Sequence, residues 1–584
     1  MNSQKSLALF IYPRIYLFGI ILFGGLTACG QSDNPIAENE VAEPAHDVTM
    51  TSDPLTLIET EGLLQKIGTL ASDEFGGRAP MSEGERLTLN YLETQFQEMG
   101  LEPMFGDSYR QAVPLVAIEA HGDMTMHIGD ESDSVSLSYS NGPETAVWTK
   151  RLVKETGLNN SELVWAGYGI IAPEYDWNAY EGLDVTGKTV IVLVNDPGYA
   201  TQNPDLFNGN SMTYYGRWTY KYEEAARQGA AGALIIHQTA PAAYGWNVVE
   251  DSFGGTQFHL ANDNDNMDRL KVEGWLQYEV AEELFNISGM DLEGMSKDAA
   301  SAAVKPQSMG LLASVNVRNT IHRAESYNVG AVLPGSTQAD ELFIYMAHWD
   351  HLGTTPHEKG QEGDFIFNGA EDNASGTGGM LEIAQAFAAL PAGPQRSVGF
   401  IAVTGEESGL LGSLAYASKP AFPMNKTVGG INMDRLNFRG KMNDVVVIGY
   451  GGSEMETILA EEALPYGRTL TPESTPEKGY YYRSDHFNFA KKGVPILYAR
   501  GGTTDRTHGA EYITQRNADF VKNRYHSPAD EVRDDWDLDA AVEDLVIFYK
   551  IGKRLANSSE WPQWFEGNEF RAIREASLDP KNVE

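Results

Sequence analysis

The chain of 584 residues contains a single cysteine, Cys29. With no second thiol, no disulfide can form within the chain, so its stability must come from packing. Its 59 glycines and 26 prolines are close to average usage, and 42% of its residues are hydrophobic, which excludes the fibrous and disordered classes. A globular chain of this length is expected to fold as two or more domains.

Basic residues are also scarce. The sequence has 43 Lys and Arg against 82 Asp and Glu, which gives a formal net charge of −39. A surface of this charge repels nucleic acid and anionic membranes, and no basic stripe offsets the repulsion. We therefore expect no nucleic-acid partner.

One apolar run lies near the N-terminus, from Ile15 to Leu26, and follows Lys5 and Arg14. It is long enough for the core of a signal peptide and short for a membrane-spanning helix. Residues 26–29 read Leu-Thr-Ala-Cys, which resembles the lipobox of bacterial lipoproteins. The resemblance implies that residues 1–28 are a signal peptide and that Cys29 carries lipid. The alternative is an uncleaved anchor helix.

The same resemblance predicts where the protein resides. It implies a location in the cell envelope, lipid-anchored at the outer membrane or the periplasmic face, or else secretion. Contact with a membrane is expected only through this anchor. Residues 29–53 are polar and lack an apolar period, which predicts a flexible tether.

The remaining chain divides into regions of different pattern. Residues 54–125 show helical spacing of apolar residues, first at Leu63, Leu64, Ile67 and Leu70 and again over 87–96. Residues 126–309 contain short apolar runs such as 190–194 and 233–236 between Gly, Asn and Pro turns, with one helix from Lys221 to Gln228. This region resembles the protease-associated domain, a β-rich insert. Residues 310–557 return to alternating strands and helices, and 558–584 form a tail.

Uninterrupted apolar runs at 342–347, 398–403 and 428–433 are separated by helical segments. Continuous apolar strands alternating with helices are typical of a parallel sheet covered on both faces. The predicted fold class is therefore α/β, with a mostly parallel central sheet, helices on both faces, and the β-rich region inserted.

Each of these runs ends in residues that bind metals. The first is followed by His348, the second by Glu406 and Glu407, and the third by Asp434. Single residues of these types usually serve as caps or solvated surface, but open α/β sheets bind ligands at the carboxyl ends of their strands. Imidazole nitrogens and carboxylate oxygens are the ligands that zinc prefers.

The motifs occur in a specific order: His-x-Asp at 348–350, Asp-Asn-x-Ser-Gly at 372–376, Glu-Glu-x-Gly-Leu-Leu-Gly-Ser at 406–413, Met-Asp at 433–434, and Tyr-His-x-x-x-Asp at 525–530. This order is similar to the M28 family of zinc exopeptidases. The resemblance covers residues 55–125 and 310–550, with the protease-associated domain between them.

The resemblance implies a centre of two zinc ions. By motif, His348 and Asp434 hold one ion, Glu407 and His526 hold the other, and Asp372 bridges both.

Catalytic roles carry over in the same way. Glu406 takes the place of the general base, and Asp350 resembles the carboxylate that orients His348. Tyr525 matches a tyrosine that hydrogen-bonds the developing oxyanion. Ser484, Asp485 and His486 superficially resemble a nucleophile set, but no Gly-x-Ser-x-Gly elbow occurs in the chain.

The resulting expectation is a peptidase that removes N-terminal residues from peptide substrates. A carboxypeptidase or dipeptidase of the same fold is the main alternative, and a carboxypeptidase would need a cationic clamp for a substrate carboxylate. Arg435, Arg483, Arg500 and Arg506 are candidates that the sequence does not rank. A glutaminyl cyclase with one zinc ion, or a binding protein without metal, are further alternatives.

Overall fold

The computed structural model describes residues 53–121, 124–132, 134–253, 256–355, 361, 363–579 and 581. The predicted signal peptide 1–28, Cys29 and nearly all of the predicted tether 29–53 lie outside the described residues. Within the described part of the chain, every helix is too short or too polar to cross a membrane.

The predicted parallel strands form the centre of a mixed sheet. Strand β14 (Gln338–His348) lies between β17 (Arg396–Val403) and β18 (Thr427–Asn432), and β18 pairs with β21 (Ile496–Arg500), all in parallel. Antiparallel neighbours flank them: the end of β13 (Gln307–Leu333) pairs with β17, and β19 (Asp444–Val447) pairs with β21. The predicted fold class is confirmed.

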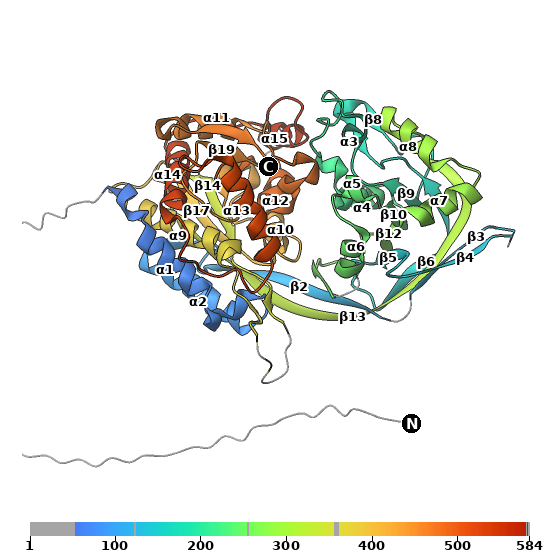
Figure 1. Cartoon of the computed structure of the whole chain (residues 1–584), viewed down its shortest axis with the longest axis horizontal. Helices are drawn as coiled ribbons and strands as arrows, with labels where there is room; N and C mark the ends of the chain where they lie inside the picture. Colours follow the sequence, from blue (N-terminus) through green and yellow to red (C-terminus); the bar gives the residue numbers. More distant parts are fainter. Residues whose placement is uncertain are drawn as a thin grey trace, which may run out of the picture. The chain divides into compact units, whose positions relative to one another are not determined.

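Helices cover both faces of this sheet, because side chains along a strand alternate between faces. Phe343 and Tyr345 of β14 pack in one core with α1 (Thr60–Leu70), α9 (Ser375–Ala388) and α14 (Leu538–Leu555). Ile344 and Met346 face the opposite core, with α10 (Leu411–Ser418) and α12 (His486–Ala490). Figure 1 shows α1 and α9 beside β14 and β17.

The first apolar pattern forms helix α1, as its spacing predicts. The buried stripe of α1 consists of Leu63, Ile67 and Leu70, whereas Leu64 is 38% exposed. The second apolar pattern forms α2 (Glu83–Glu98), in which Leu89, Leu92 and Phe96 are buried. Because an α-helix has 3.6 residues per turn, Leu64 points away from the sheet although the adjacent Leu63 is buried against it.

The middle region has its own parallel strands. Strand β10 (Gly232–Ile236) lies between β9 (Thr189–Leu193) and β12 (Val272–Leu276), with helix α4 (Trp218–Arg227) packed nearby. Alternate side chains of β10 enter separate cores, Leu234 and Ile236 in one and Ala233 and Ile235 in the other. Helices and strands alternate here too, so the region is mixed rather than purely β.

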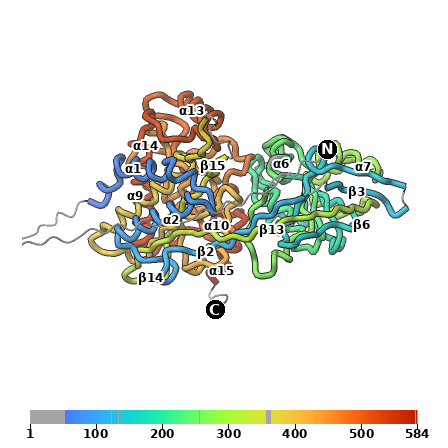
Figure 2. The backbone as a smooth tube through the Cα atoms, turned by 90° about the horizontal axis from the view of Figure 1, so that it is seen from below, coloured from blue at the N-terminus to red at the C-terminus, as the bar shows by residue number. Residues whose placement is uncertain are grey.

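Two long strands run between the regions. Strand β2 (Arg110–His121) pairs antiparallel with β13 along its whole length, from Arg110 opposite Val329 to His121 opposite Arg318. The earlier half of β13 pairs with β6 (Glu155–Trp165). Both views show β2 and β13 side by side (Figures 1 and 2). The boundary that we predict between residues 309 and 310 falls inside β13.

A buried arginine ties the N-terminal helices to the strand ends. Arg78 is 1% exposed, and its guanidinium donates to the carbonyl oxygens of Leu70 (2.6 Å), Trp349 (2.9 Å), Asn368 (2.6 Å) and Gly369 (2.9 Å). Buried carbonyl groups need donors, and here a single side chain supplies several of them. The loops after β14 and before α9 are therefore fixed against helix α1.

We predict that Arg78→Met lowers the free energy of unfolding by about 3 kcal/mol or more, because it removes charge-assisted hydrogen bonds and leaves buried carbonyl groups without donors. Urea denaturation measures the change. The matched control is Arg86→Met on α2, whose side chain is 56% exposed and pairs with Glu83; its midpoint should not move measurably. Equal shifts of the two midpoints would contradict the role of Arg78.

Candidate metal centre

The proposed ligands lie where the topology predicts them. His348 is the last residue of β14, Glu406 and Glu407 lie in the turn after β17, and Asp434 follows β18. These strands are parallel neighbours, so their carboxyl ends share one edge of the sheet. The other two ligands come from connections: Asp372 lies in the turn η5 (Ala370–Ala374) before α9, and His526 follows α13 (Gly509–Asn523).

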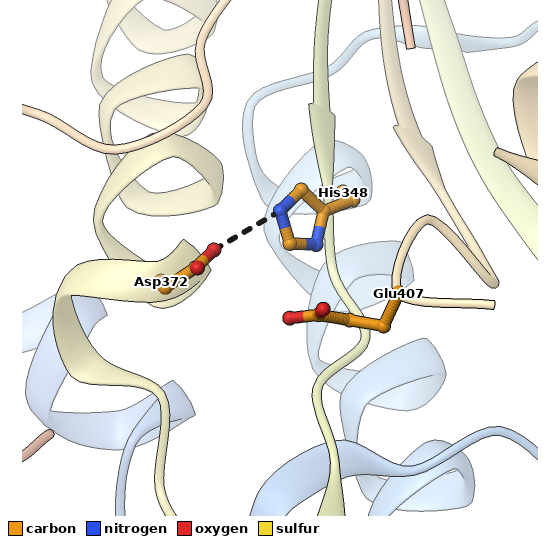
Figure 3. Close-up of side chains that lie close together, drawn as sticks. All are labelled: His348, Asp372 and Glu407. Carbon is orange, nitrogen blue, oxygen red and sulfur yellow. Dashed lines mark ion pairs between the residues drawn. The ribbon is translucent and has the colours of Figure 1, made fainter. Parts of the chain in front are cut away.

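Asp372 lies between two histidines. Its Oδ1 is 3.3 Å from His348 Nε2, and its Oδ2 is 3.6 Å from His526 Nε2. On the first side Asp434 Oδ1 lies 3.8 Å from His348 Nε2, and on the second Glu407 Oε2 lies 3.1 Å from His526 Nε2. The predicted ligands thus converge in two groups that share one carboxylate. Figure 3 shows His348, Asp372 and Glu407 directed toward one another.

The imidazole nitrogens and carboxylate oxygens of the site are arranged as they would be around a cation. Neither His348 Nε2 nor His526 Nε2 makes a hydrogen bond with the described residues, although carboxylate oxygens lie close to both. His348, Asp372 and Glu407 offer ligand atoms within 4.8 Å of one another, as do His348, Glu406 and Asp434. Buried polar atoms normally find hydrogen-bond partners. Imidazole and carboxylate donors grouped in this way fit zinc.

The charges of the site are strongly coupled. Burial opposes a charge on His526, but Asp372 and Glu407 outweigh it and raise the pKa of His526 to about 10. Burial is also the main cause that raises the pKa of Glu406 well above its usual value, and Glu407 and Asp434 add to it. The concentration of carboxylates therefore favours positive charge at this place in the site, whether a proton or a metal ion supplies it.

The end of β14 is joined to the turn that follows β17. His348 Nδ1 donates to the main-chain oxygen of Asp350 at 3.1 Å, while the Asp350 carboxylate is farther away at 3.8 Å. That carboxylate accepts a hydrogen bond from the Glu406 amide at 3.2 Å. Burial raises the pKa of Asp350 to about 7. The residue thus orients His348 through its carbonyl oxygen and holds Glu406 through its side chain.

Two residues with a part in the site were not assigned from the sequence. Asp530 is buried, and its two carboxylate oxygens accept from the amides of Glu371 and Asp372, each at 3.0 Å. His351 donates from Nδ1 to Glu407 Oε1 at 2.7 Å. Asp530 ends the last motif and His351 directly follows the first, but their partners are distant in sequence and only the fold shows them.

Tyr525 and the Ser484–His486 segment are also near the centre. The Tyr525 ring stacks on His526 with 3.9 Å between centroids and is 43% exposed. Ser484 accepts from Asn432, whereas the Asp485 carboxylate accepts from the Ser413 hydroxyl. The side chains of the segment are thus directed to different partners and do not form a nucleophile set.

Residues 328–549 match the sequence model of peptidase family M28. The chain carries a peptidase family M28 domain. The match spans β14, β17, β18 and β21 and includes every ligand described above.

Several solved structures are similar to the chain. The aminopeptidase from Aneurinibacillus sp. strain AM-1 has 18% sequence identity and a TM-score of 0.43, with 88% of this chain and 97% of that chain covered. BSAP, a zinc aminopeptidase from Bacillus subtilis, has 15% identity and a TM-score of 0.39, covering 88% and 98%. The peptidase M28 precursor from Shewanella amazonensis SB2B has 17% identity and a TM-score of 0.37, covering 87% and 98%.

We predict that Asp530→Ala weakens zinc binding by about 10- to 100-fold, because the amide of Asp372 then loses the acceptor that fixes it. Competition with a chelator measures the affinity, and circular dichroism checks the fold. Asp534→Ala, in the exposed segment a few residues later, is the control and should bind zinc as the parent protein does. An unchanged affinity in Asp530→Ala would show that the turn holds Asp372 by itself.

Proposed function

We propose that the protein is a metal-dependent exopeptidase that hydrolyses N-terminal residues from peptides with two zinc ions and Glu406 as general base. The observation that carries the proposal is the position of Asp372, whose two oxygens face His348 on one side and His526 on the other. The M28 domain supports a peptidase.

The five ligands divide into two sets in this proposal. His348 and Asp434 hold one ion, Glu407 and His526 hold the other, and Asp372 is shared. When bound, such a pair lowers the pKa of a water molecule and polarises the scissile carbonyl. The carboxylates of the set offset the charge of the ions.

Glu406 handles the proton in the proposed reaction. It lies beside His348 and Asp434, and its amide is held by Asp350. In this proposal Glu406 holds no ion, so its carboxylate is left to accept a proton. Its Oε takes a proton from the attacking water and returns it to the leaving amine. Tyr525, exposed beside His526, is proposed to donate to the oxyanion.

The charge of the site favours a substrate with a free amino group. Asp372, Glu406, Glu407 and Asp434 gather at one edge of the sheet, while the nearby Glu371 is neutralised by Arg439 at 2.5 Å. In this proposal the ions offset the three ligand carboxylates, so the charge left to attract a cationic N-terminus is that of Glu406, and holding the N-terminus in place positions the first peptide bond. A carboxypeptidase or dipeptidase, a glutaminyl cyclase and a metal-free binding protein are the alternatives.

The cellular location of the protein and the identity of its middle region are also proposals. We propose that Cys29 carries a lipid anchor in the cell envelope and that the middle region is a protease-associated domain. The anchor is then the protein's only contact with a membrane, and peptides are its partners.

We predict that Glu406→Gln lowers kcat by about 10²- to 10⁴-fold, because the amide cannot accept the proton. Metal analysis of the purified variant should give the same zinc content as the parent. Glu454→Gln on the surface helix α11 (Glu454–Ala463) is the control and should keep full activity. A variant that keeps most of its kcat, or that loses zinc, would show that Glu406 is not the base.

The choice between exopeptidase types is tested with matched peptides, one with a free N-terminus and one acetylated, each with a free or an amidated C-terminus. We expect cleavage of the free peptide from its N-terminus, no cleavage of the acetylated one, and cleavage that survives amidation. Zinc content should be two ions per chain. Cleavage that tolerates acetylation and is blocked by amidation would establish a carboxypeptidase, and a single zinc with cyclase activity would establish the transferase.

A further inference from the structure

Two adjacent glutamates follow β17, and their closeness to the site does not by itself separate their roles. Glu407 groups with His348 and Asp372, and Glu406 groups with His348 and Asp434, in each case with ligand atoms within 4.8 Å of one another. Either carboxylate therefore lies close enough to His348 to share an ion with it. A metal ligand and a general base are different chemical roles, so another contact has to distinguish the two glutamates.

The distinguishing contact comes from His351. Its Nδ1 lies 2.7 Å from Oε1 of Glu407, and Oε2 of the same carboxylate lies 3.1 Å from Nε2 of His526. Glu407 is thus held between two imidazole rings, one at each oxygen. The Glu406 carboxylate makes no hydrogen bond or ion pair within the described part of the chain, whereas the amide of that residue donates to Asp350.

The geometry of this contact places a proton on the His351 ring. An ionised carboxylate only accepts hydrogen bonds, so the Nδ1 atom that faces Glu407 carries a proton. The other ring nitrogen, Nε2, is buried and has no hydrogen-bond partner among the described residues. His351 therefore acts on the site through Nδ1.

The His351 ring is enclosed by neighbouring main chain. The residue is 1% exposed, and a Cβ on Gly369 would lie 2.6 Å from its Cδ2, so the ring packs directly against that glycine. The carbonyl oxygen of Gly369 accepts from the Arg78 guanidinium, and the His351 amide donates to the carbonyl oxygen of Arg78 at 3.4 Å. A donor fixed in this way also fixes its acceptor, because the Glu407 carboxylate cannot rotate without breaking the hydrogen bond.

We propose that His351 is a positioning residue that assigns different roles to the two glutamates. Its hydrogen bond to Oε1 leaves Oε2 as the oxygen of Glu407 that faces His526, so Glu407 is a ligand through a single oxygen and Glu406 is left to handle the proton. The proposal rests on the metal centre and the function proposed above. It names the side chain that keeps one glutamate on the metal and the other off it.

The test uses the difference between the two ring nitrogens. In His351→Asn the amide nitrogen takes the place of Nδ1 and still donates to Glu407, whereas in His351→Gln it takes the place of Nε2 and does not. Zinc affinity of the full chain is measured by competition with a chelator, and circular dichroism checks the fold. The cobalt-substituted proteins are compared by visible absorption, which depends on the number and geometry of the ligands.

We expect His351→Gln to bind one of the two zinc ions about 10- to 100-fold more weakly and to change the cobalt spectrum, because Glu407 is then free to turn. His351→Asn should keep the zinc affinity and the cobalt spectrum of the parent protein. The matched control is His508→Gln. His508 is exposed and its Nδ1 also donates to a carboxylate, that of Asp505, at 2.8 Å. This variant should bind zinc and cobalt as the parent does.

Parental zinc affinity and an unchanged cobalt spectrum in His351→Gln would overturn the role of His351, and so would equal losses in the asparagine and glutamine variants. Should His351→Gln not fold, His351→Ala, which has no donor, replaces it with the same expectations. None of these measurements uses a substrate. A parent protein that binds two zinc ions but cleaves no peptide therefore contradicts the proposed function alone, and metal binding still decides the role of His351. A parent protein that binds no zinc overturns both.

Discussion

The arrangement of the site depends on one carboxylate shared between two histidines. The two carboxylate oxygens of Asp372 face His348 and His526, and the Asp530 carboxylate accepts a hydrogen bond from the Asp372 amide. A carboxylate that bridges two ions, as we propose for Asp372, must be fixed more firmly than a terminal ligand, because a shift toward one ion takes it away from the other. The buried hydrogen bonds that Asp530 accepts and the anchoring of the preceding loop by Arg78 meet this requirement.

The parallel strands supply the other half of the geometry. Three neighbours in one sheet end at the same edge, so the residues that follow them approach one another although they are far apart in sequence. Asp350 then links two of these ends, because its carbonyl oxygen meets His348 and its carboxylate meets Glu406. Strand order therefore decides which of the strand-end side chains meet, while Asp372 and His526 come from connections.

The strands and the convergence of the proposed ligands were predictable because each leaves a local signal. Continuous apolar runs marked β14, β17 and β18, and the order of the motifs located the ligands that the structure brings together. The sequence does not show that Asp530 contacts Asp372 or that His351 contacts Glu407, because these contacts join segments that are far apart in the chain.

The pairing of β2 with β13 has a consequence for how the two regions came to share one chain. In topological terms the whole middle region is the connection of an antiparallel hairpin, since β2 leads into it and β13 leads out. The two ends of such a connection lie side by side, so a folded unit of any size can occupy the tip while the parent sheet keeps its register. Lengthening or exchanging that unit would therefore leave the side chains at the ends of the central strands where they are.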